Sequence, residues 1–335
     1  MKFYKMLFFL TLMLGTLIAI SSYSWLSMWM GLEINLLSII PLLKDSKNLY
    51  PSEAALKYFI TQALASSILL FSIVLSLNLS EFMDYPKNFI ILMMNSALMT
   101  KLGAAPFHSW FPEVMEGLNW NNATIMLTWQ KIAPMVLVMY NCQLTYFMLA
   151  IIIFSTILSG TLGLNQISLR KILTYSSINH IGWMLASMLN SQTIWMIYFL
   201  IYTLITLNLI VIFHYFKIYF LNQFFFVSNN LKMIKFFFIC NFLSLGGLPP
   251  FLGFFPKWMV INNLISNNFY LMSTLLIVFT LISLYFYLRV TFSTILLNSS
   301  ETLMIPCKKI GFSIYFVNFL SLSGLLVSTL IFNIF

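Results

Sequence analysis

Long apolar runs, separated by short polar clusters, extend from one end of this 335-residue chain to the other. A run of about 20 apolar residues is long enough to cross a bilayer as a helix. The predicted fold class is therefore an all-α membrane protein. The pattern predicts about eleven transmembrane helices, over residues 3–22, 25–43, 54–77, 88–118, 121–141, 145–165, 168–189, 192–220, 233–266, 269–297 and 311–334.

The first of these runs is compatible with either a secretory signal or a retained membrane helix. It is long and is not followed by a small-residue cleavage site, which favours a retained helix. The longest polar connections, 44–52 and 298–309, are too short to form a soluble domain. We therefore expect a single transmembrane domain over 1–335, divided into 3–141, 145–297 and a C-terminal helix at 311–334.

Positive residues are concentrated in alternate connections between the predicted helices. Such loops stay on the side from which a membrane protein is inserted. The opposite loops hold little beyond Lys87. This asymmetry predicts an odd number of helices, with the N-terminus on the inner side and the C-terminus across the membrane. The residues on the N-terminal side are Lys2, Lys5, Lys44, Lys47, Arg170, Lys171, Lys217, Lys232, Lys235, Lys308 and Lys309.

Two predicted helices, 88–118 and 233–266, are too long for one span and are interrupted by glycine and proline. Proline removes a backbone hydrogen bond that lipid cannot replace, so such breaks must lie inside protein. The breaks align without gaps, GAAPFHSWFPE at 103–113 on GLPPFLGFFPK at 247–257, with five of eleven positions identical. Because the two helices lie five apart, they predict inverted repeats whose discontinuous helices mark a transport site. The alternative is chance similarity between proline-rich aromatic segments.

Composition agrees with a membrane protein, since 61% of the residues are hydrophobic and 7% are charged. A soluble domain of this size needs far more surface charge, which excludes a water-soluble enzyme. The net charge of +9 is dispersed between apolar segments and reflects topology rather than nucleic-acid binding. Cys142, Cys240 and Cys307 lack the spacing of zinc, haem or iron–sulfur ligands, so we expect no metal or redox centre in this chain.

Four charged residues lie within predicted membrane helices, where each costs about 2.5–3.5 kcal/mol at the bilayer centre. They are one acid and three bases, each on a different helix: Glu33, Lys101, Lys131 and Lys257. A Glu33–Lys101 ion pair could serve only to hold helices together, but such a pair rarely stabilises more than an apolar replacement would. Lys257 could instead lie near an interface and extend its amine to water. We interpret all four as candidate proton carriers.

A polar stripe is predicted beside Lys131 in the helix 121–141. At 100° per residue the lysine shares an arc of about 80° with three polar residues, Asn121, Thr124 and Thr128. In the helix 25–43, by contrast, a face of small and polar residues points away from Glu33. We interpret that face as a packing surface, formed by Ser27, Gly31, Asn35 and Ser38.

His180 is a further candidate, because a neutral imidazole inside a membrane can pass a proton between waters. It lies in a polar stripe with Ser176, Asn179 and Ser187. The alternative is a hydrogen-bonded packing residue. A separate group after the first break is interpreted as a solvated or interfacial face. Metal binding there is disfavoured because the histidine and the nearer glutamate are five apart; the group is His108, Glu113 and Glu116.

Five segments carry distinctive motifs, in order over nearly the whole chain. They are WMGLEIN at 29–35, TKLGAAPFHSW at 100–110, WQKIAP at 129–134, LTYSSINHIG at 173–182 and GGLPPF at 246–251, the last followed by Lys257. On these motifs the chain resembles the antiporter-like membrane subunits of respiratory complex I, the NADH:ubiquinone oxidoreductase.

The resemblance implies a proton channel in the inner mitochondrial membrane, built from two five-helix inverted repeats. It implies that Glu33 is the family's glutamate and Lys101 its broken-helix lysine. Lys131 would be the next lysine of the path and Lys257 the lysine on the exit side, with His180 among the hydrating residues between them. NADH, FMN, iron–sulfur clusters and ubiquinone are expected in partner subunits, with no cofactor in this chain.

The resemblance also implies partners. These are the other membrane-arm subunits, supernumerary subunits and membrane lipids, with cardiolipin as a candidate. The chain looks three helices shorter at its N-terminus than fourteen-helix members, a place that supernumerary subunits would fill.

Two other functions are compatible with the sequence. An independent cation/proton antiporter would contain the same broken inverted repeats but would work without NADH oxidation. A passive structural subunit is disfavoured by the buried lysines, because neutralising them would then change assembly only. Association with a large redox assembly is what distinguishes a subunit of complex I from an independent antiporter.

Overall fold

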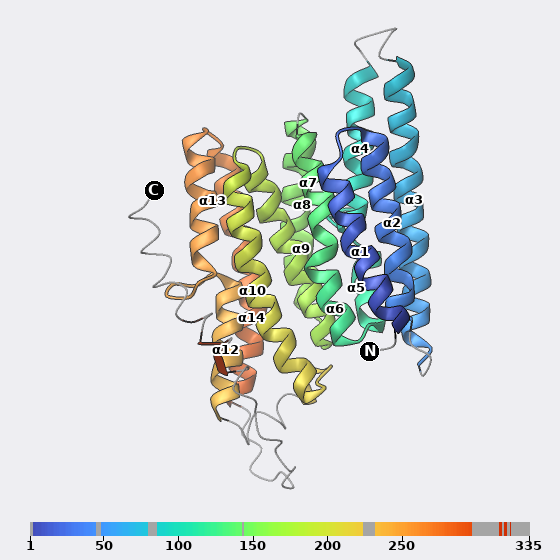
Figure 1. Ribbon diagram of the computed structural model, residues 1–335. Helices are drawn as coiled ribbons and strands as arrows, with labels where there is room; N and C mark the ends of the chain where they lie inside the picture. The colour runs from blue at the N-terminus through green and yellow to red at the C-terminus, as the bar shows by residue number, and fades with distance from the viewer. Residues whose placement is uncertain are drawn as a thin grey trace. The chain divides into compact units, whose positions relative to one another are not determined.

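The protein is α-helical in the computed structural model, which describes residues 3–44, 48–79, 86–142, 144–223 and 232–296, together with 315, 316, 318, 319 and 322. Helices occupy ten of the eleven predicted ranges (Figure 1). The eleventh range, 311–334, lies largely outside the described residues, as do Lys2, Lys47, Lys308 and Lys309.

The chain forms two compact units, Met1–Phe154 and Ser155–Phe335. Helix α8 (Thr145–Gly163) crosses the boundary between them in sequence. The first unit, blue to green in Figure 1, contains α1 (Phe3–Ser21), α2 (Trp25–Leu43), α3 (Tyr50–Leu79), α4 (Pro86–Leu102), α5 (Trp110–Gly117), α6 (Trp120–Leu127), the 3₁₀ turn η1 (Trp129–Lys131) and α7 (Ile132–Tyr140). The second contains α9 (Leu169–Met188), α10 (Gln192–Phe216), α12 (Lys232–Gly246), α13 (Phe254–Ser266) and α14 (Tyr270–Leu296).

Close backbone contact joins α1 to α2 in the first unit. A Cβ added at Gly31 would lie 2.6 Å from the Ala19 nitrogen, and one added at Gly15 would lie 2.9 Å from the Asn35 nitrogen. Small residues allow membrane helices to approach this closely, which gives them dispersion contacts that lipid would otherwise make. The prediction that Gly31 is a packing residue is therefore confirmed.

The first interrupted helix ends at a left-handed glycine. The Ala104 N–H donates to the Met99 carbonyl at 3.1 Å, and the Gly103 N–H donates to the Thr100 carbonyl at 3.2 Å. Gly103 has φ +72°, a conformation that costs other residues steric energy. This pair of bonds is the Schellman motif, which satisfies the last carbonyls of a helix. These bonds satisfy the Met99 and Thr100 carbonyls where the helix ends.

The second interrupted helix ends in the same way. The Leu248 N–H donates to the Leu243 carbonyl at 3.3 Å, and the Gly247 N–H donates to the Ser244 carbonyl at 3.0 Å. Gly247 has φ +77°. In the gap-free alignment Gly247 corresponds to Gly103, and the helices that follow, α13 and α5, also begin at aligned positions. The two breaks are thus alike in backbone hydrogen bonding as well as in sequence.

The predicted helix 121–141 is not continuous. It divides into α6, the 3₁₀ turn η1 and α7, because Pro134 lacks the N–H that would bond to the Gln130 carbonyl and its ring crowds that carbonyl. A 3₁₀ turn advances about 120° per residue rather than 100°. The predicted stripe is consequently wrong: Asn121 is exposed, whereas Lys131 is buried.

Among the described residues, seven helical stretches are long and apolar enough to cross a membrane. They are α1, α2, α3, Trp120–Tyr140, α8, α10 and α14. The helices that do not meet the criterion fall into two groups. The halves of the broken helices are short, and α9 is polar for its length and buried along nearly all of it. These exceptions carry Lys101, His180 and Lys257.

Candidate functional site

Lys101 lies in the last turn of α4 and is 8% exposed. It lines a small cavity of about 20 Å³, together with Tyr58, Gln62, Asn35 and Gln130 from neighbouring helices. A cavity of this size has room for about one water, and its polar lining supplies the partners that a buried water needs. The amine is therefore placed beside a hydratable polar chamber inside the first unit.

Glu33 lies in the middle of α2 and is partly buried. Its Oε1 atom is buried and accepts no hydrogen bond from the described residues. Neither of its oxygens lies within 4.0 Å of the Lys101 amine, the limit for an ion pair, although the two groups interact electrostatically. The pair therefore does not clamp α2 to α4 through direct contact, which argues against a purely structural role.

Lys131 is the last residue of η1 and is 2% exposed. Its amine lies 5.7 Å from the centre of the Phe111 ring, which belongs to α5. An aromatic face at this distance attracts a cation, most strongly where water is excluded. The lysine predicted as a central helix residue thus lies at an interruption of its own helix, in contact with the half-helix that follows the first break.

An amide pair joins the second helix to the segment of Lys131. Asn35 donates to the Gln130 side-chain oxygen at 3.1 Å, and Gln130 donates back to the Asn35 side-chain oxygen at 2.8 Å. Both residues line the cavity of Lys101. The interpretation of Asn35 as a packing residue was therefore incomplete, because the pair connects the chamber of Lys101 to the neighbour of Lys131.

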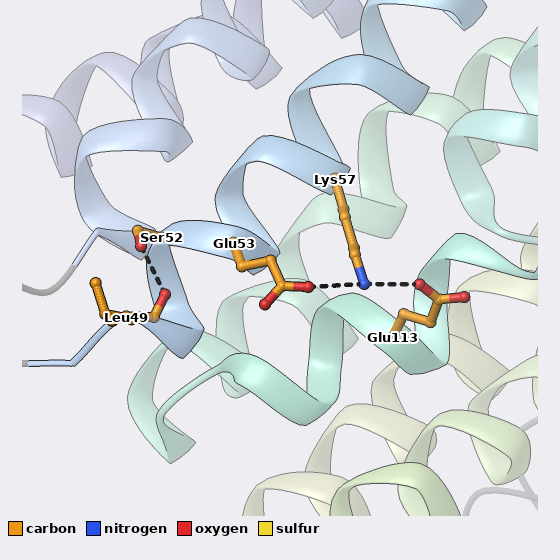
Figure 2. Close-up of polar contacts among 5 residues, drawn as sticks. All are labelled: Leu49, Ser52, Glu53, Lys57 and Glu113. Carbon is orange, nitrogen blue, oxygen red and sulfur yellow. Dashed lines mark hydrogen bonds and ion pairs between the residues drawn. The ribbon is translucent and has the colours of Figure 1, made fainter.

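Glu113 forms a surface ion-pair cluster with two residues of α3. Figure 2 shows the Lys57 amine between Glu53 and Glu113, at 3.1 Å and 3.0 Å from their carboxylate oxygens. The Glu113 side chain is 58% exposed. The cluster attaches α5, the short half-helix after the first break, to α3. The predicted solvated face is thus confirmed at Glu113.

The neighbouring group does not form a metal site. His108 is half-buried and its Nδ1 atom lies 3.3 Å from the Pro106 carbonyl oxygen. Within the described part of the chain, no three His, Cys, Asp or Glu side chains come together as a metal ion would require. Cys142 and Cys240 are free thiols. Burial raises the pKa of Cys142 to about 11, which keeps this thiol protonated and unreactive.

Lys257 lies in the first turn of α13, is 7% exposed, and extends back to the end of α12. Its amine donates to the Gly246 carbonyl at 2.8 Å and to the Leu245 carbonyl at 3.4 Å. Terminal carbonyls carry the negative end of the helix dipole, so they stabilise an ammonium there. The amine also lies 5.7 Å from the Trp183 ring of α9. The alternative that this lysine extends to interfacial water is not supported.

Substitution of Gly247 by alanine should displace Lys257. The new Cβ would lie 2.7 Å from the lysine Cδ atom, and φ +77° would be strained by about 1–2 kcal/mol. Gly246→Ala is the matched control, since its Cβ would meet nothing nearer than 3.6 Å. We expect the first variant to lose thermal stability and the second to retain it, measured by thermal melting in detergent. Equal retention in both would contradict the arrangement.

His180 lies on the buried helix α9, and its Nδ1 atom is 2.8 Å from the Tyr198 hydroxyl of α10. The Tyr202 ring lies 5.1 Å from the imidazole. One residue earlier on α9, Asn179 donates to the Ser283 hydroxyl of α14 at 3.0 Å. The predicted polar stripe therefore contacts α10 and α14, and Trp183, which lies beside the Lys257 amine, is one turn from His180 on α9.

The structure thus groups the candidate residues by unit. Glu33, Lys101 and Lys131 lie in the first unit, where Lys101 shares a cavity with the Asn35–Gln130 pair. His180 and Lys257 lie along α9 in the second. Sequence reasoning missed four polar side chains that complete these groups, namely Tyr58, Gln62, Gln130 and Tyr198. The signal available in the sequence was a hydroxyl or amide group within an apolar run.

A protein-family model matches most of the chain, including the interrupted helices that carry the buried amines. Residues 22–283 match the family model described as NADH:quinone oxidoreductase/Mrp antiporter, TM. The chain belongs to this family.

Relatives of the chain within the NADH:quinone oxidoreductase/Mrp antiporter family cover nearly its full length. NADH-ubiquinone oxidoreductase chain 2 of Anopheles gambiae is 48% identical over 336 residues, which is 98% of each chain. The protein of the same name from Aedes aegypti is 50% identical over 334 residues, again 98% of each. The resemblance found from the motifs is therefore confirmed.

Solved structures share the fold of this family member. A chain of respiratory complex I from Thermus thermophilus has a TM-score of 0.87 at 24% identity, covering 98% of this chain and 79% of that one. A chain of the Mrp complex from a Dietzia species has a TM-score of 0.79 at 14% identity, covering 97% and 75%. At these identities the likeness establishes the all-helical membrane fold.

Proposed function

We propose that this chain is the antiporter-like, proton-translocating subunit 2 of respiratory complex I. It couples electron transfer from NADH to ubiquinone, which occurs in other subunits, to proton movement across the inner mitochondrial membrane. The observation that carries this function is the position of three buried amines, Lys101, Lys131 and Lys257, each at a helix interruption. Burying an amine in an apolar helical protein is costly, and a purely structural role would not require it.

In the first unit, protons would pass between Lys101 and Lys131. The cavity beside Lys101 has room for a bridging water, and it is bounded by Gln130, the residue before Lys131. The Asn35–Gln130 pair offers both hydrogen-bond donors and acceptors, so it can hold that water in place. The proposed path is short because Lys101, Asn35 and Gln130 border one chamber and Lys131 directly follows Gln130 in the chain.

Glu33 would control when Lys101 holds its proton. An ionised carboxylate nearby stabilises a buried ammonium, and neutralising or withdrawing that carboxylate leaves the desolvation of the amine unopposed. The buried Oε1 atom of Glu33 has no hydrogen bond from the described residues, so local contacts do not hold this carboxylate to one position. A change of charge at Glu33 is therefore coupled to proton release from Lys101.

In the second unit, His180 and Lys257 would continue the path toward the exit side. The Lys257 amine faces carbonyls at the end of α12, which can accept its hydrogen bonds in either protonation state. Since Tyr198 can donate to or accept from the imidazole Nδ1, it can select which ring nitrogen carries the proton.

The repeat architecture belongs to the same proposal. Among the described residues, each proposed half contains five helical segments of which the fourth is interrupted, α4 and α5 in one and α12 and α13 in the other. An odd number of segments inverts the second half relative to the membrane, as in transporters built from inverted repeats. With the positive connections on the matrix side, the N-terminus lies in the matrix and the eleventh helix brings the C-terminus to the intermembrane space.

Native-gel electrophoresis tests membership of the complex. We expect the chain to migrate with NADH-oxidising activity in a large assembly that contains FMN, iron–sulfur clusters, ubiquinone, other membrane-arm and supernumerary subunits, and lipids such as cardiolipin. A chain that purifies alone and catalyses cation/proton exchange without NADH would instead be an independent secondary transporter.

Replacing Tyr198 by phenylalanine should slow proton translocation several-fold without preventing assembly. The substitution keeps the buried ring but removes the hydroxyl that lies 2.8 Å from His180. Tyr285→Phe, at a 62% exposed position on α14, is the control. The pH profile of NADH-driven translocation should change in the first variant only. An unchanged rate and profile in Tyr198→Phe would remove this tyrosine from the path.

A further inference from the structure

A second cavity lies in the Ser155–Phe335 unit, away from His180 and Lys257. It has a volume of about 250 Å³ and is lined by parts of α8, α14, the start of α9 and the segment after α10. Its polar lining is contributed by Arg289, Gln166, Asn222 and Ser293. We call it the Arg289 pocket. Pockets for drug-sized ligands are about 300–1,000 Å³, so this one suits a smaller polar group.

The pocket lies where several helices of this unit end or begin. α8 ends at Gly163 and α9 begins at Leu169, and the segment after α10 lies opposite them. An apolar helical protein reaches the headgroup region of a bilayer at such ends. The Arg289 pocket is therefore at the level of lipid headgroups rather than in the hydrocarbon core.

The wall between α9 and α10 is fixed by backbone hydrogen bonds. The Leu169 N–H donates to the Tyr219 carbonyl at 3.0 Å, and the Leu221 N–H donates to the Ile167 carbonyl at 3.3 Å. Arg289 is held by a hydrogen bond to the Leu164 carbonyl at 2.7 Å. A guanidinium has five N–H donors, so this bond orients the group and leaves others for a ligand.

The charges of the surroundings select for an anion. None of the residues that line the pocket is acidic. In the whole sequence from 155 to 335, Glu301 is the only carboxylate side chain, against nine lysines and arginines before and after it. A positively charged headgroup would thus find no partner here. A guanidinium matches the geometry of a phosphate, which it can bind through two parallel hydrogen bonds.

We infer that the Arg289 pocket binds the phosphate of an anionic phospholipid whose acyl chains lie along α14. Exposed apolar side chains lie beside it, which a freely dissolved anion would not need. Ile167 lines the pocket and is 62% exposed, and Tyr285 and Phe292 lie one turn from Arg289 on the same face of α14. Basic pockets between membrane helices bind lipid headgroups by this combination of charge and apolar surface. The inference requires membrane insertion but no proton translocation.

Photo-crosslinking in the assembled complex tests this site. Vesicles contain phosphatidylglycerol with a photoreactive group near its phosphate, or phosphatidylcholine with the same group, and labelled peptides are identified by mass spectrometry. We expect phosphatidylglycerol to label peptides around 163–172 and 286–293, with labelling about tenfold lower in Arg289→Gln. Arg170→Gln is the control, because it removes a charge from the first turn of α9, where the guanidinium lies over the Tyr219 ring. It should retain full labelling.

Three results would overturn the inference. They are equal labelling by phosphatidylcholine, unchanged labelling in Arg289→Gln, and displacement of the probe by millimolar inorganic phosphate, which would indicate a site for free anions. If Arg289→Gln fails to assemble, Ser293→Phe provides the test, since it fills the pocket while keeping the arginine. Labelling that persists in Ser293→Phe would likewise place the lipid elsewhere.

Discussion

Replacement of Lys101 by methionine is expected to lower NADH-driven proton translocation by about 10²-fold, the usual contribution of a positioned proton-transfer group. Methionine fills a similar volume but cannot carry a proton. The amine borders the one-water chamber that connects α4 to Gln130, so its removal interrupts the proposed path at this chamber. The measurement is the initial rate of pH change in vesicles containing the complex, together with the rate of NADH oxidation.

Lys57→Met is the matched control for this experiment. Lys57 is also a lysine of the first unit, but its side chain is 44% exposed and is paired with Glu53 and Glu113 (Figure 2). Exposed ion pairs contribute little to stability, and this cluster lies outside the chamber. The control should translocate protons at nearly the normal rate. A normal ratio of protons to NADH in Lys101→Met would show that Lys101 is not a carrier.

Glu33→Gln distinguishes a carboxylate that acts through Lys101 from one with an independent role. If Glu33 works by stabilising the protonated amine, its substitution should have little further effect once Lys101 is methionine. Residues that act as a unit are non-additive in this way. Additive losses in the variant that combines Glu33→Gln with Lys101→Met would assign Glu33 a separate function. Comparing the two single variants with the double variant therefore measures the coupling between Glu33 and Lys101, which lie farther apart than an ion pair.

The two helix breaks were predictable from the sequence because their cause is local. Glycine at φ above +70° and the prolines that follow act on their own segment of backbone, so GAAP and GLPP mark the breaks without knowledge of the fold. The buried charges were predictable for a similar reason. The cost of Lys101 or Lys257 inside an apolar run depends on the run itself.

The surroundings of those charges were not predictable because they depend on tertiary contacts. Asn35 and Gln130 are 95 positions apart, and nothing in either segment specifies that their amides form a pair. Tyr198 is likewise one tyrosine among 16 until α10 packs on α9. Pro134 was a visible local signal, and neglecting it produced the wrong polar stripe beside Lys131, since the 100° rule was extended through an interrupted helix.

Replacement of Lys131 by methionine should lower translocation by about 10²-fold while leaving the stability of the complex unchanged or higher. Lys131 is 2% exposed, and exchanging a buried charge for an apolar group of similar size is often neutral or stabilising. The Phe111 ring that now lies 5.7 Å from the amine would pack against the methionine sulfur instead. Stability is measured by the thermal melting of the complex on native gels, and translocation by vesicle acidification.

The combination of results separates the two possible roles of this lysine. A carrier predicts loss of translocation in complexes that assemble normally, with about 10²-fold lower rates. A structural lysine predicts the reverse, namely fewer assembled complexes that each translocate at the normal rate. Lys44→Met, at an exposed position at the end of α2, controls for the loss of one positive charge from the same unit and should leave both measurements unchanged.

Pro134→Ala should also lower translocation, although it retains the Lys131 amine. The substitution restores a backbone N–H and favours a continuous helix, whereas η1 now holds Lys131 between α6 and α7.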